Sequence, residues 1–398
     1  MSPQSDRIAI THEEIAEECT PHFEVVIVQR RLTHYRAPLF VHLRALLEAQ
    51  NIKLRLLHGM STKAEAAKAD GGNLPWAERL PTTYWFGGRF CWQPFGAKTS
   101  NADLVIITQE NRLLYNLWAL LVGRPIGRPK CVAFWGHGAN LQADDRNVWR
   151  ERFKRALIKQ VDWWFAYSNL SADLVRAAGF PVSRITILNN AVDTRALAQQ
   201  CDEISEAEIS SARDRLDLKD AHVCLFLGSL YEEKRLPFLL EVGENIFQRN
   251  PLFRLVVCGD GPQRQLVERA ARLRPWVRFL GMQQGRDKAI ALRLADLMLN
   301  PGLVGLGILD AFVAGIPLIT TDCRIHSPEI AYLVSGENGV MTANTVAAFS
   351  DTVIHLLQDE RERRRLGGNA RSTAAHYTIE NMAQRFRDGI LSALQTPI

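Results

Sequence analysis

The sequence is poor in the features that mark membrane-spanning, exported and metal-clustered proteins. Its apolar runs all stay shorter than about 18 residues, the length that a helix needs to cross a bilayer. Residues 1–22 are polar and contain no apolar signal core, so we expect an N-terminal tail there rather than an export signal. The seven cysteines form no C-x-x-C pair, and several lie in apolar strand-like runs. They predict buried free thiols in a reducing cytoplasm and no metal site.

An excess of charge of one sign is also missing. The chain has 48 basic and 43 acidic residues, and its formal net charge of +5 is too small to indicate nucleic-acid binding. The hydrophobic content of 47% is typical of a soluble globular protein with large cores. A length of 398 residues favours two domains over one.

Buried-strand segments recur in two series, with helical patterns between most of them. The first series comprises residues 24–28, 53–58, 104–108, 130–134, 163–167 and 185–188, and the second comprises 222–227, 253–258, 277–280, 297–300 and 317–321. Strands that alternate with helices form parallel sheets. We therefore predict an α/β protein with two Rossmann-like domains that face each other across a cleft. A ligand is then expected at the carboxyl ends of the strands.

The polar, helix-prone stretch between the two series predicts the domain boundary. We place the N-terminal domain at residues 23–205 and the C-terminal domain at residues 206–377. Apolar residues at helical spacing from Ile379 to Leu394 predict a terminal helix.

The segment from Asn300 to Asp322 predicts a strand end, a glycine-rich loop, a helix, a glycine stop and a buried strand. Gly305, Leu306 and Gly307 lie where the loop enters the helix. Exposed N–H groups and the positive end of a helix form an anion site that suits a nucleotide-sugar diphosphate. The alternative is an ordinary strand–loop–helix connection of an α/β sheet.

Two further segments place polar side chains after buried strands. Lys234 and Arg235 follow a strand that ends at Gly228, where cations can clamp a phosphate; a solvated charged turn is the alternative. His137 lies between glycines after the strand at 130–134. It could hydrogen-bond a substrate or carry a proton, or it could be structural.

Basic residues gather in two other segments. His34, Tyr35 and Arg36 follow the first strand, either as contacts for a polar or anionic acceptor or as a basic surface loop. Residues 147–164 interleave basic residues with Trp149, Phe153 and other apolar residues at helical spacing. This pattern is typical either of a packed helix with a solvated basic face or of a surface that leans on anionic lipid.

Together these segments resemble the family-4 retaining glycosyltransferases, also labelled group 1, which have the two-Rossmann GT-B fold. FLGSLYEEKRLPFLLE resembles the family's strand–G-R-L-x-x-x-K-G–helix element, and LVVCGDGPQRQLVE resembles its strand–G-D-G-P–helix element. The stretch from Val277 to Asp322 is similar to the F-x-G … E-G-x-G … E-A … G-x-P-V-I-x-T element. SPEIAYLVSGENGV, ILNNAVDTRAL and HYRAPLF resemble the P-E-I … G-x-N-G ending, the N-G-V-D-x-x-x-F signature and the H-Y-R-x-P-x-F variant of the first loop.

Three positions depart from the family's pattern. Ser229 stands where the family has the arginine of G-R-L, so the basic pair that meets the diphosphate is reduced to Lys234. Arg235, the next residue, is a candidate to replace the missing arginine. In the E-x7-E pair, Gly302 replaces the first acid, which reads hydroxyls of the donor sugar in relatives. Asp310 replaces the second acid, which is usually held to the ribose.

The resemblance implies a metal-independent, hexosyltransferase-like enzyme without a cofactor. It implies transfer of a sugar from a nucleotide diphosphate-sugar to a polysaccharide, a lipid-linked oligosaccharide or another glycan, with retention at the anomeric carbon. The implied donor-binding residues are Gly228, Ser229, Lys234, Arg235, Gly305, Leu306, Gly307 and Asp310. The implied catalytic residues are His137 and Lys234, and the acceptor-binding ones are His34, Tyr35 and Arg36.

The resemblance also implies a C-terminal helix, residues 378–398, that crosses back onto the N-terminal domain. We expect a cytoplasmic protein, peripheral on the inner face of the membrane if the acceptor is lipid-linked. The departures at Ser229 and Gly302 keep a second hypothesis open, a nucleotide-sugar-binding protein with impaired catalysis. A nucleotide-sugar epimerase of the same architecture is the weaker third hypothesis.

Overall fold

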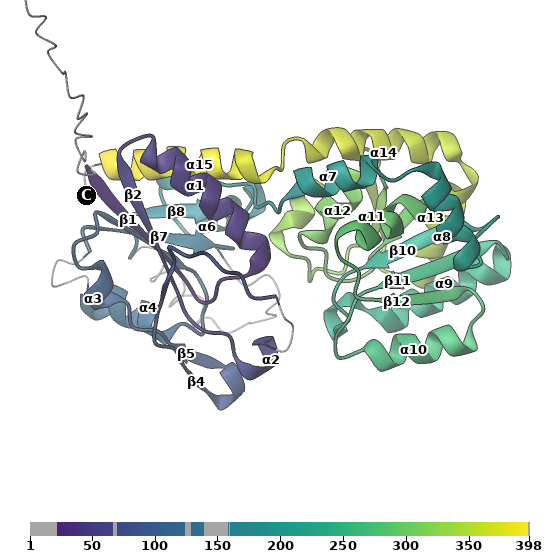
Figure 1. Cartoon of the computed structure of the whole chain (residues 1–398), viewed down its shortest axis with the longest axis horizontal. Helices are drawn as coiled ribbons and strands as arrows, with labels where there is room; N and C mark the ends of the chain where they lie inside the picture. The colour runs from purple at the N-terminus through teal and green to yellow at the C-terminus, as the bar shows by residue number, and fades with distance from the viewer. Residues whose placement is uncertain (1–21, 67–69, 124–128, 139–157, 159, 397–398) are drawn as a thin grey trace, which may run out of the picture.

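The chain folds into two α/β units, each built around its own sheet (Figure 1). The structure is a computed structural model that describes residues 22–66, 70–123, 129–138, 158 and 160–396. The predicted α/β class with two parallel sheets is confirmed. Within the described residues, no helix combines the length and the apolar character that crossing a bilayer requires.

The first sheet has seven parallel strands in the order β3-β2-β1-β6-β7-β8-β9. Its strands are β1 (Phe23–Gln29), β2 (Ile52–His58), β3 (Glu78–Arg79), β6 (Leu104–Thr108), β7 (Cys131–Gly136), β8 (Trp163–Ala166) and β9 (Ile185–Ile187). The main helices around it are α1 (Ala37–Glu48), α2 (Lys63–Ala66), α3 (Gly96–Thr99), α4 (Leu114–Trp118) and α6 (Asn169–Ala177). Apolar runs such as LVIIT form these strands because both faces of the sheet are covered, and every residue of β6 is buried.

The two faces of the first sheet have separate cores. Val25 and Ile27 of β1 belong to the same core as Leu39 and Leu43 of α1. Val26 and Val28 point the other way, into a core that contains Phe95 and Tyr115. On that second side lies an antiparallel hairpin that the sequence pattern does not predict. It consists of β4 (Thr83–Trp85), the 3-10 turn η2 (Phe86–Gly88) and β5 (Phe90–Trp92).

The second sheet has six parallel strands in the order β12-β11-β10-β13-β14-β15. Its strands are β10 (His222–Leu227), β11 (Phe253–Cys258), β12 (Val277–Gly281), β13 (Leu297–Leu299), β14 (Leu318–Thr321) and β15 (Gly339–Thr342). Its helices are α7 (Thr194–Asp202), α8 (Glu206–Arg215), α9 (Leu236–Arg249), α10 (Arg264–Leu273), α11 (Gly285–Leu294), α12 (Gly307–Ala314), α13 (Val346–Gln358) and α14 (Glu360–Ala374).

Local sequence signals start and stop these helices. Ser205 and Glu208 form a capping box at the start of α8, in which each side chain accepts from the other residue's backbone N–H. Gly315 ends α12 in the left-handed conformation, with φ +70°, which glycine adopts without a steric penalty. Pro317 then prevents the helix from continuing, and β14 begins at the next residue.

The last helix, α15 (Ile379–Gln395), leaves the second unit and packs against α1, β8 and β9 of the first. The ring of Phe386 lies 5.0 Å from that of Trp135 and 4.6 Å from that of Phe165. Thr378 caps the helix by accepting from the N–H of Asn381. Helix α7, which precedes the second sheet in the chain, already packs against α11 and α12 of the second unit. We therefore propose a domain boundary near residue 193, upstream of our sequence-based boundary at 205.

Candidate functional site

Lys234 is a buried cation at the carboxyl end of the second sheet. It closes the 3-10 turn η6 (Glu232–Lys234), which follows β10, and its side chain is only 8% exposed. Its Nζ donates a hydrogen bond of 2.6 Å to the carbonyl oxygen of Leu303. Burial lowers the pKa of Lys234 to about 8. No carboxylate of the described residues forms an ion pair with it, so this is a charge for which an added anion would be a favourable partner.

Close packing against the turn that carries Lys234 explains why position 302 is a glycine. A Cβ atom added to Gly302 would lie 2.2 Å from the carbonyl oxygen of Glu233 and 2.6 Å from the carbonyl carbon of Lys234. The next residue, Leu303, donates its N–H to the same Glu233 oxygen over 2.8 Å. The turn that carries Lys234 therefore rests directly on this glycine, and the backbone arrangement leaves no room for an acidic side chain there.

The start of α12 lies beside this turn. A Cβ atom added to Gly305 would lie 3.5 Å from Ser327 Oγ, and one added to Gly307 would meet only the carbonyl oxygen of Leu227, at 3.9 Å. Leu306 is the N-cap residue of α12, which begins at Gly307. The structure therefore places the three predicted loop residues at the N-terminal end of a two-turn helix, with open space beside Gly307 and the end of β10 nearby. The positive end of the helix dipole favours an anion at this position.

Two predicted donor residues already have protein partners. Asp310, in the first turn of α12, forms an ion pair of 2.7 Å with Lys288 of α11 through Oδ1. Arg235 donates from one nitrogen to the carbonyl oxygen of Pro301, to Thr321 Oγ1 and to Asn344 Oδ1. Its guanidinium also lies 4.3 Å from the ring centre of Phe238.

The predicted donor residues differ in whether the protein already occupies their polar groups. Arg235 holds the loop after β13 to the segments that carry Thr321 and Asn344. Ser229 itself is exposed, and Gly228 lies beside the aliphatic end of Lys234, with 3.8 Å between a built Cβ atom and Lys234 Cε. The one cation of this segment that remains without an acceptor side chain among the described residues is Lys234.

The loop after β14 supports the glycine-rich segment from behind. His326 accepts the N–H of Val304 at Nδ1, over 3.1 Å, and its Nε2 lies 2.7 Å from the carbonyl oxygen of Thr321. Cys323 Sγ lies 3.5 Å from the same Nε2. Although burial raises it, these contacts with His326 and Thr321 lower the pKa of the Cys323 thiol to about 7.

His137 occupies the end of β7 in the first sheet. Its ring lies 4.4 Å from that of Tyr167 in an edge-to-face arrangement, and its Nδ1 is buried without a hydrogen-bond partner. Burial lowers the pKa of His137, Glu329 partly offsets this shift, and Arg36 adds to it. The imidazole is therefore neutral at neutral pH and can offer a hydrogen bond to a hydroxyl group.

The first loop has one half that is anchored by ion pairs and one half that carries exposed side chains. Arg30 is buried and binds Glu65 over 2.7 Å and Glu110 over 3.2 Å, while Arg31 binds Asp70 over 2.6 Å. These two arginines thus anchor the loop. His34, Tyr35 and Arg36 follow in the 3-10 turn η1 (His34–Arg36), where His34 and Tyr35 are exposed.

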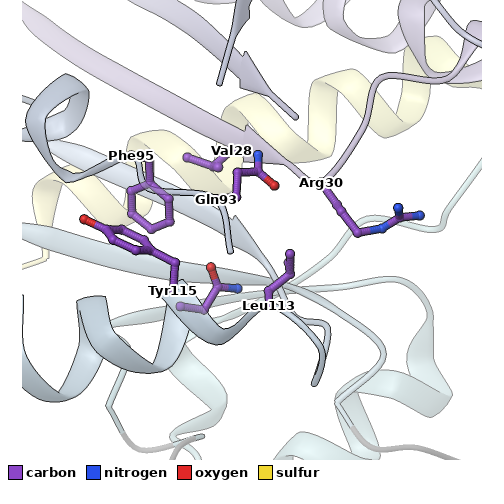
Figure 2. A pocket seen from close by; sticks show the side chains of 7 residues that line it. Val28, Arg30, Gln93, Phe95, Leu113 and Tyr115 are labelled. Carbon is purple, nitrogen blue, oxygen red and sulfur yellow. The ribbon is translucent and has the colours of Figure 1, made fainter. Parts of the chain in front are cut away.

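A small cavity lies beneath the anchored half of the loop. Figure 2 shows Gln93 and Leu113 between Arg30 and the rings of Phe95 and Tyr115. The cavity has a volume of about 10 Å³, enough for one water molecule, and Gln93 Oε1 has no hydrogen-bond partner there. It is far too small for a nucleotide.

Arg36 connects the two units through Asn190 and Glu329. Arg36 Nη1 donates to Asn190 Oδ1 over 2.6 Å, and Asn190 Nδ2 donates to Glu329 Oε1 over 2.5 Å. Tyr332 Oη donates to the Asn190 carbonyl oxygen over 3.0 Å. Asn190 follows β9, whereas Glu329 and Tyr332 lie in η7 (Pro328–Tyr332), which follows β14. The guanidinium of Arg36 also lies 5.3 Å from the ring of Trp135.

Sequence reasoning did not select Asn190 and Glu329 as functional residues. Both lie in segments whose motifs were recognised, ILNNAVDTRAL and SPEIAYLVSGENGV. Their contact spans 139 positions of the chain, so no local pattern could pair them. Glu329 is 3% exposed and forms no ion pair with a described residue, and it brings a buried carboxylate near His137 and Arg36.

Two further predictions, on metal binding and on the basic aromatic segment, depend on which residues the structure describes. In the parts of the chain whose structure is described, no three His, Cys, Asp or Glu side chains gather as a metal ion would require. The basic aromatic segment with Trp149 and Phe153 lies almost entirely outside those parts. Its interpretation as a lipid-facing surface therefore stays a prediction.

Comparison with known proteins identifies the second unit. Residues 221–359 match the family described as Glycosyl transferases group 1. The chain is 32% identical over 159 residues to phosphatidyl-myo-inositol mannosyltransferase of Mycobacterium tuberculosis, covering 37% of this chain and 41% of that protein. It is 22% identical over 184 residues to alpha-monoglucosyldiacylglycerol synthase of Acholeplasma laidlawii, covering 44% of this chain and 45% of the relative. The matches thus span under half of the curated relatives' length.

The whole fold has solved counterparts. Anabaena Alr3699/HepE in complex with UDP superposes with a TM-score of 0.67 at 15% identity, covering 93% of this chain and 100% of that one. At this identity the likeness shows the fold alone. Residues 221–359 are therefore similar to the group 1 glycosyltransferases, in a chain that has the GT-B fold.

Proposed function

We propose that this chain is a retaining glycosyltransferase. It moves a hexose from a nucleotide diphosphate-sugar to a polysaccharide, a lipid-linked oligosaccharide or another glycan acceptor, with neither a metal ion nor a resident cofactor. The observation that carries the proposal is Lys234, a buried ammonium that lacks a counter-ion among the described residues and contacts the loop leading into α12. The group 1 match, the sugar-transferring relatives and the UDP in a structural neighbour support it.

The proposed chemistry centres on the leaving diphosphate. As the bond between the sugar and the phosphate oxygen breaks, negative charge grows on that oxygen. Lys234 and the N–H groups at Gly305–Gly307 are fixed before the reaction, so they stabilise this charge without rearranging. The acceptor oxygen bonds to the anomeric carbon on the same face, and its proton passes to the leaving phosphate oxygen. No carboxylate nucleophile is required.

Groups of the first unit hold the sugar and the acceptor in this proposal. His137, neutral and with a free buried Nδ1, hydrogen-bonds a hydroxyl of the transferred sugar. Arg36 contributes a fixed positive charge on the acceptor side, where His34 and Tyr35 are exposed for contact. On the donor side, the second oxygen of Asp310 accepts from a ribose hydroxyl while the first holds Lys288. Gly228, Ser229 and the backbone near Arg235 complete the proposed donor site.

We also propose a location and partners for the reaction. Nucleotide sugars are cytoplasmic, so we place the enzyme there, peripheral on the inner face of the membrane where its acceptor is lipid-linked. The relatives' names include phosphatidyl-myo-inositol and diacylglycerol, which favours a lipid among the acceptor classes. We expect no nucleic-acid partner, because the net charge of +5 is modest.

A thermal-shift screen over nucleoside diphosphates and their sugars tests the donor site. A ligand that binds the folded state stabilises it by about 2.7 kcal/mol at a concentration one hundred times its Kd. We expect one base to give such a shift, and Lys234→Met to abolish it. The matched control is Lys219→Met, which removes an exposed lysine of the same unit. Equal shifts in both variants would place the diphosphate elsewhere.

The second candidate function is nucleotide-sugar binding without catalysis. It is favoured by Gly302, whose packing leaves no acid to hold the donor sugar, and by Ser229. Sugar transfer and donor hydrolysis are measured on the same protein that gives a thermal shift. Binding with neither reaction, over a panel of soluble and lipid-linked acceptors, supports this candidate and contradicts the first. Transfer that persists in EDTA agrees with a metal-independent mechanism, and its loss in EDTA contradicts it.

A further inference from the structure

The side chain of Asn190 joins a cation of the first unit to a carboxylate of the second. Its Oδ1 accepts from Arg36 Nη1 over 2.6 Å, and its Nδ2 donates to Glu329 Oε1 over 2.5 Å. A guanidinium can only donate hydrogen bonds and an ionised carboxylate can only accept them. The two partners therefore fix which way the amide faces, with its oxygen toward Arg36 and its nitrogen toward Glu329. These three residues are called the amide bridge below.

Backbone contacts hold Asn190 in place from both units. Its N–H donates to the carbonyl oxygen of Tyr167 in the first unit over 2.7 Å, and its carbonyl oxygen accepts from Tyr332 Oη of the second over 3.0 Å. The preceding residue, Asn189, has φ +52°, a left-handed conformation that asparagine adopts more readily than most residues. Asn190 is 2% exposed, and protein groups already occupy its backbone and its side chain. It therefore connects other residues and is not itself placed to bind a substrate.

Glu329 is a buried carboxylate at the second-unit end of the bridge. Its side chain is 3% exposed, and no basic residue in the described part of the chain forms an ion pair with it. Burying a carboxylate without an opposite charge in contact costs stability. The hydrogen bond of this carboxylate goes to a residue of the other unit instead. Its place in the structure therefore indicates a role in how the two units meet.

Arg36, at the first-unit end, is held by aromatic rings as well as by the amide. Its guanidinium carbon lies 5.3 Å from the ring centre of Trp135, 5.7 Å from that of Tyr167 and 5.6 Å from that of Tyr35. Among the described residues, only Nη1 has hydrogen-bond partners, so Nε and Nη2 have none there. These two nitrogens remain as donors for a bound molecule, and the rings and Asn190 decide where they point.

The turn that carries Glu329 begins against the glycine-rich loop of the donor side. Ser327, the N-cap residue of η7, donates its N–H to the carbonyl oxygen of Val304 over 2.9 Å. The same turn packs against α12 of the second unit and against α6 of the first. The position of Glu329 therefore depends both on the donor-side loop and on the contact between the two units.

We propose that Asn190 and Glu329 are positioning residues that hold Arg36 in place for the acceptor only while the two units are closed on each other. When the units move apart, η7 takes Glu329 away and the amide of Asn190 is free to turn. Arg36 then loses the acceptor atom that fixes its guanidinium. The donor-side unit thus completes the acceptor site. The proposal deepens the proposed function and rests on it for the assignment of Arg36 to the acceptor.

Transfer kinetics of the full chain, with donor and acceptor varied separately, test the bridge. We expect Asn190→Ala to raise the KM for the acceptor by at least about tenfold, because a charge-assisted hydrogen bond is lost. The KM for the donor is expected to change by less than roughly threefold, since Asn190 touches no donor-binding residue. An equal rise in both values indicates general damage to the structure and overturns the proposal. Asn101→Ala, which removes an exposed asparagine of the same unit, is the matched control.

A double-mutant cycle with Arg36 separates positioning from a merely structural role. If Asn190 acts through Arg36, Asn190→Ala/Arg36→Ala has the same acceptor KM as Arg36→Ala alone. Additive losses overturn the proposal.

An exchange of the amide and the carboxylate tests the direction of the bridge. Asn190→Asp sets a second carboxylate against Glu329 and is expected to weaken acceptor binding as Asn190→Ala does. In Asn190→Asp/Glu329→Gln, the new carboxylate accepts from Arg36 on one side and from the new amide on the other. We expect the acceptor KM of this double variant to return to within roughly threefold of the wild-type value. A double variant as weak as Asn190→Asp overturns the proposal.

Melting temperatures without ligand give a readout that needs no transfer. Circular dichroism first establishes that each variant is folded. We expect the losses caused by Asn190→Ala and Arg36→Ala to be smaller together than their sum, because the two residues share one hydrogen bond. A wild-type chain that transfers no sugar to any acceptor contradicts the proposed function. In that case additive losses in melting temperature overturn the bridge as well, and non-additive losses support it.

Discussion

Replacing Lys234 with methionine is expected to stabilise the ligand-free protein and to abolish most of its activity. Burial lowers the pKa of this lysine from its usual 10.5 to about 8, a difference that corresponds to roughly 3 kcal/mol. Below about pH 8 both the folded and the unfolded chain hold the proton, so folding bears the whole cost of burying the charge. Between about pH 8 and 10.5 only the unfolded chain keeps the proton, and stability rises with pH.

Methionine removes this cost because it has a similar length and no charge. We expect Lys234→Met to raise the free energy of unfolding by about 2 kcal/mol at pH 7, with the gain shrinking as the pH rises past 8. In the proposed function the same change removes a charge partner of the leaving diphosphate, a loss of about 3 kcal/mol, so we expect kcat/KM for transfer to fall about 100-fold or more. In the wild type, kcat/KM is expected to fall above about pH 8 as Lys234 loses its proton.

Urea unfolding at pH 7 and pH 9.5, together with initial transfer rates over the same range, measures both effects. Lys219→Met, which removes an exposed lysine, is the control and is expected to change neither quantity. A Lys234→Met variant that is less stable than wild type at pH 7 would show that the ammonium is favourably paired without ligand. A variant with wild-type kcat/KM would show that Lys234 does not meet the diphosphate.

Three further outcomes follow from the site. Gly302→Glu is expected to destabilise the protein by at least about 2 kcal/mol in urea unfolding and not to improve transfer, because the new Cβ atom meets the Glu233 carbonyl oxygen; a stable, faster variant would contradict this packing. Glu329→Gln keeps a hydrogen-bond acceptor but removes the charge that raises the pKa of His137, so NMR titration should show protonation of His137 at lower pH. Cys323 is expected to react with iodoacetamide at pH 7.5 before the other described cysteines, since its thiol pKa is about 7 and they are buried; mass spectrometry after labelling decides this.

The parts of the fold that could be predicted are those whose pattern is local. LVIIT at Leu104–Thr108 and HVCLFL at His222–Leu227 are continuous apolar runs, and they form strands because both faces of each sheet are covered. The β4–β5 hairpin escaped prediction because its strands are three residues long and its turn, FGG, contains a residue type that rarely takes positive φ. Strand β15, at Gly339–Thr342, is only one residue longer.

The sequence predicts a residue of the candidate site only where one continuous segment contains both the residue and the strand that positions it. Gly305–Gly307 and Lys234 stand next to strand ends that the sequence marks, so their positions follow from the strands. The reason why position 302 is a glycine does not follow from the strands, because it depends on a turn almost 70 residues earlier in the chain. The bond between Asn190 and Glu329 likewise joins two units whose relative placement no periodicity describes. Arg235 lies in the segment where the sequence predicts it, but its guanidinium is hydrogen-bonded to Pro301 and Asn344 of the protein.

The return of α15 to the first unit means that the chain passes between the units twice, and the two passages lie side by side. The first precedes α7 and the second precedes α15, and they touch where Ala191 donates its N–H to Met382 Sδ and where Arg195 meets Glu380 at 3.6 Å. Two adjacent interdomain connections define a hinge axis that passes through both of them. We expect rotation about this axis to leave both connections unstretched, whereas twisting or sliding would stretch one of them. We therefore expect any opening of the two units to be a rotation about this axis, resisted by the hydrogen bonds that join Asn190 to Glu329 and Tyr332.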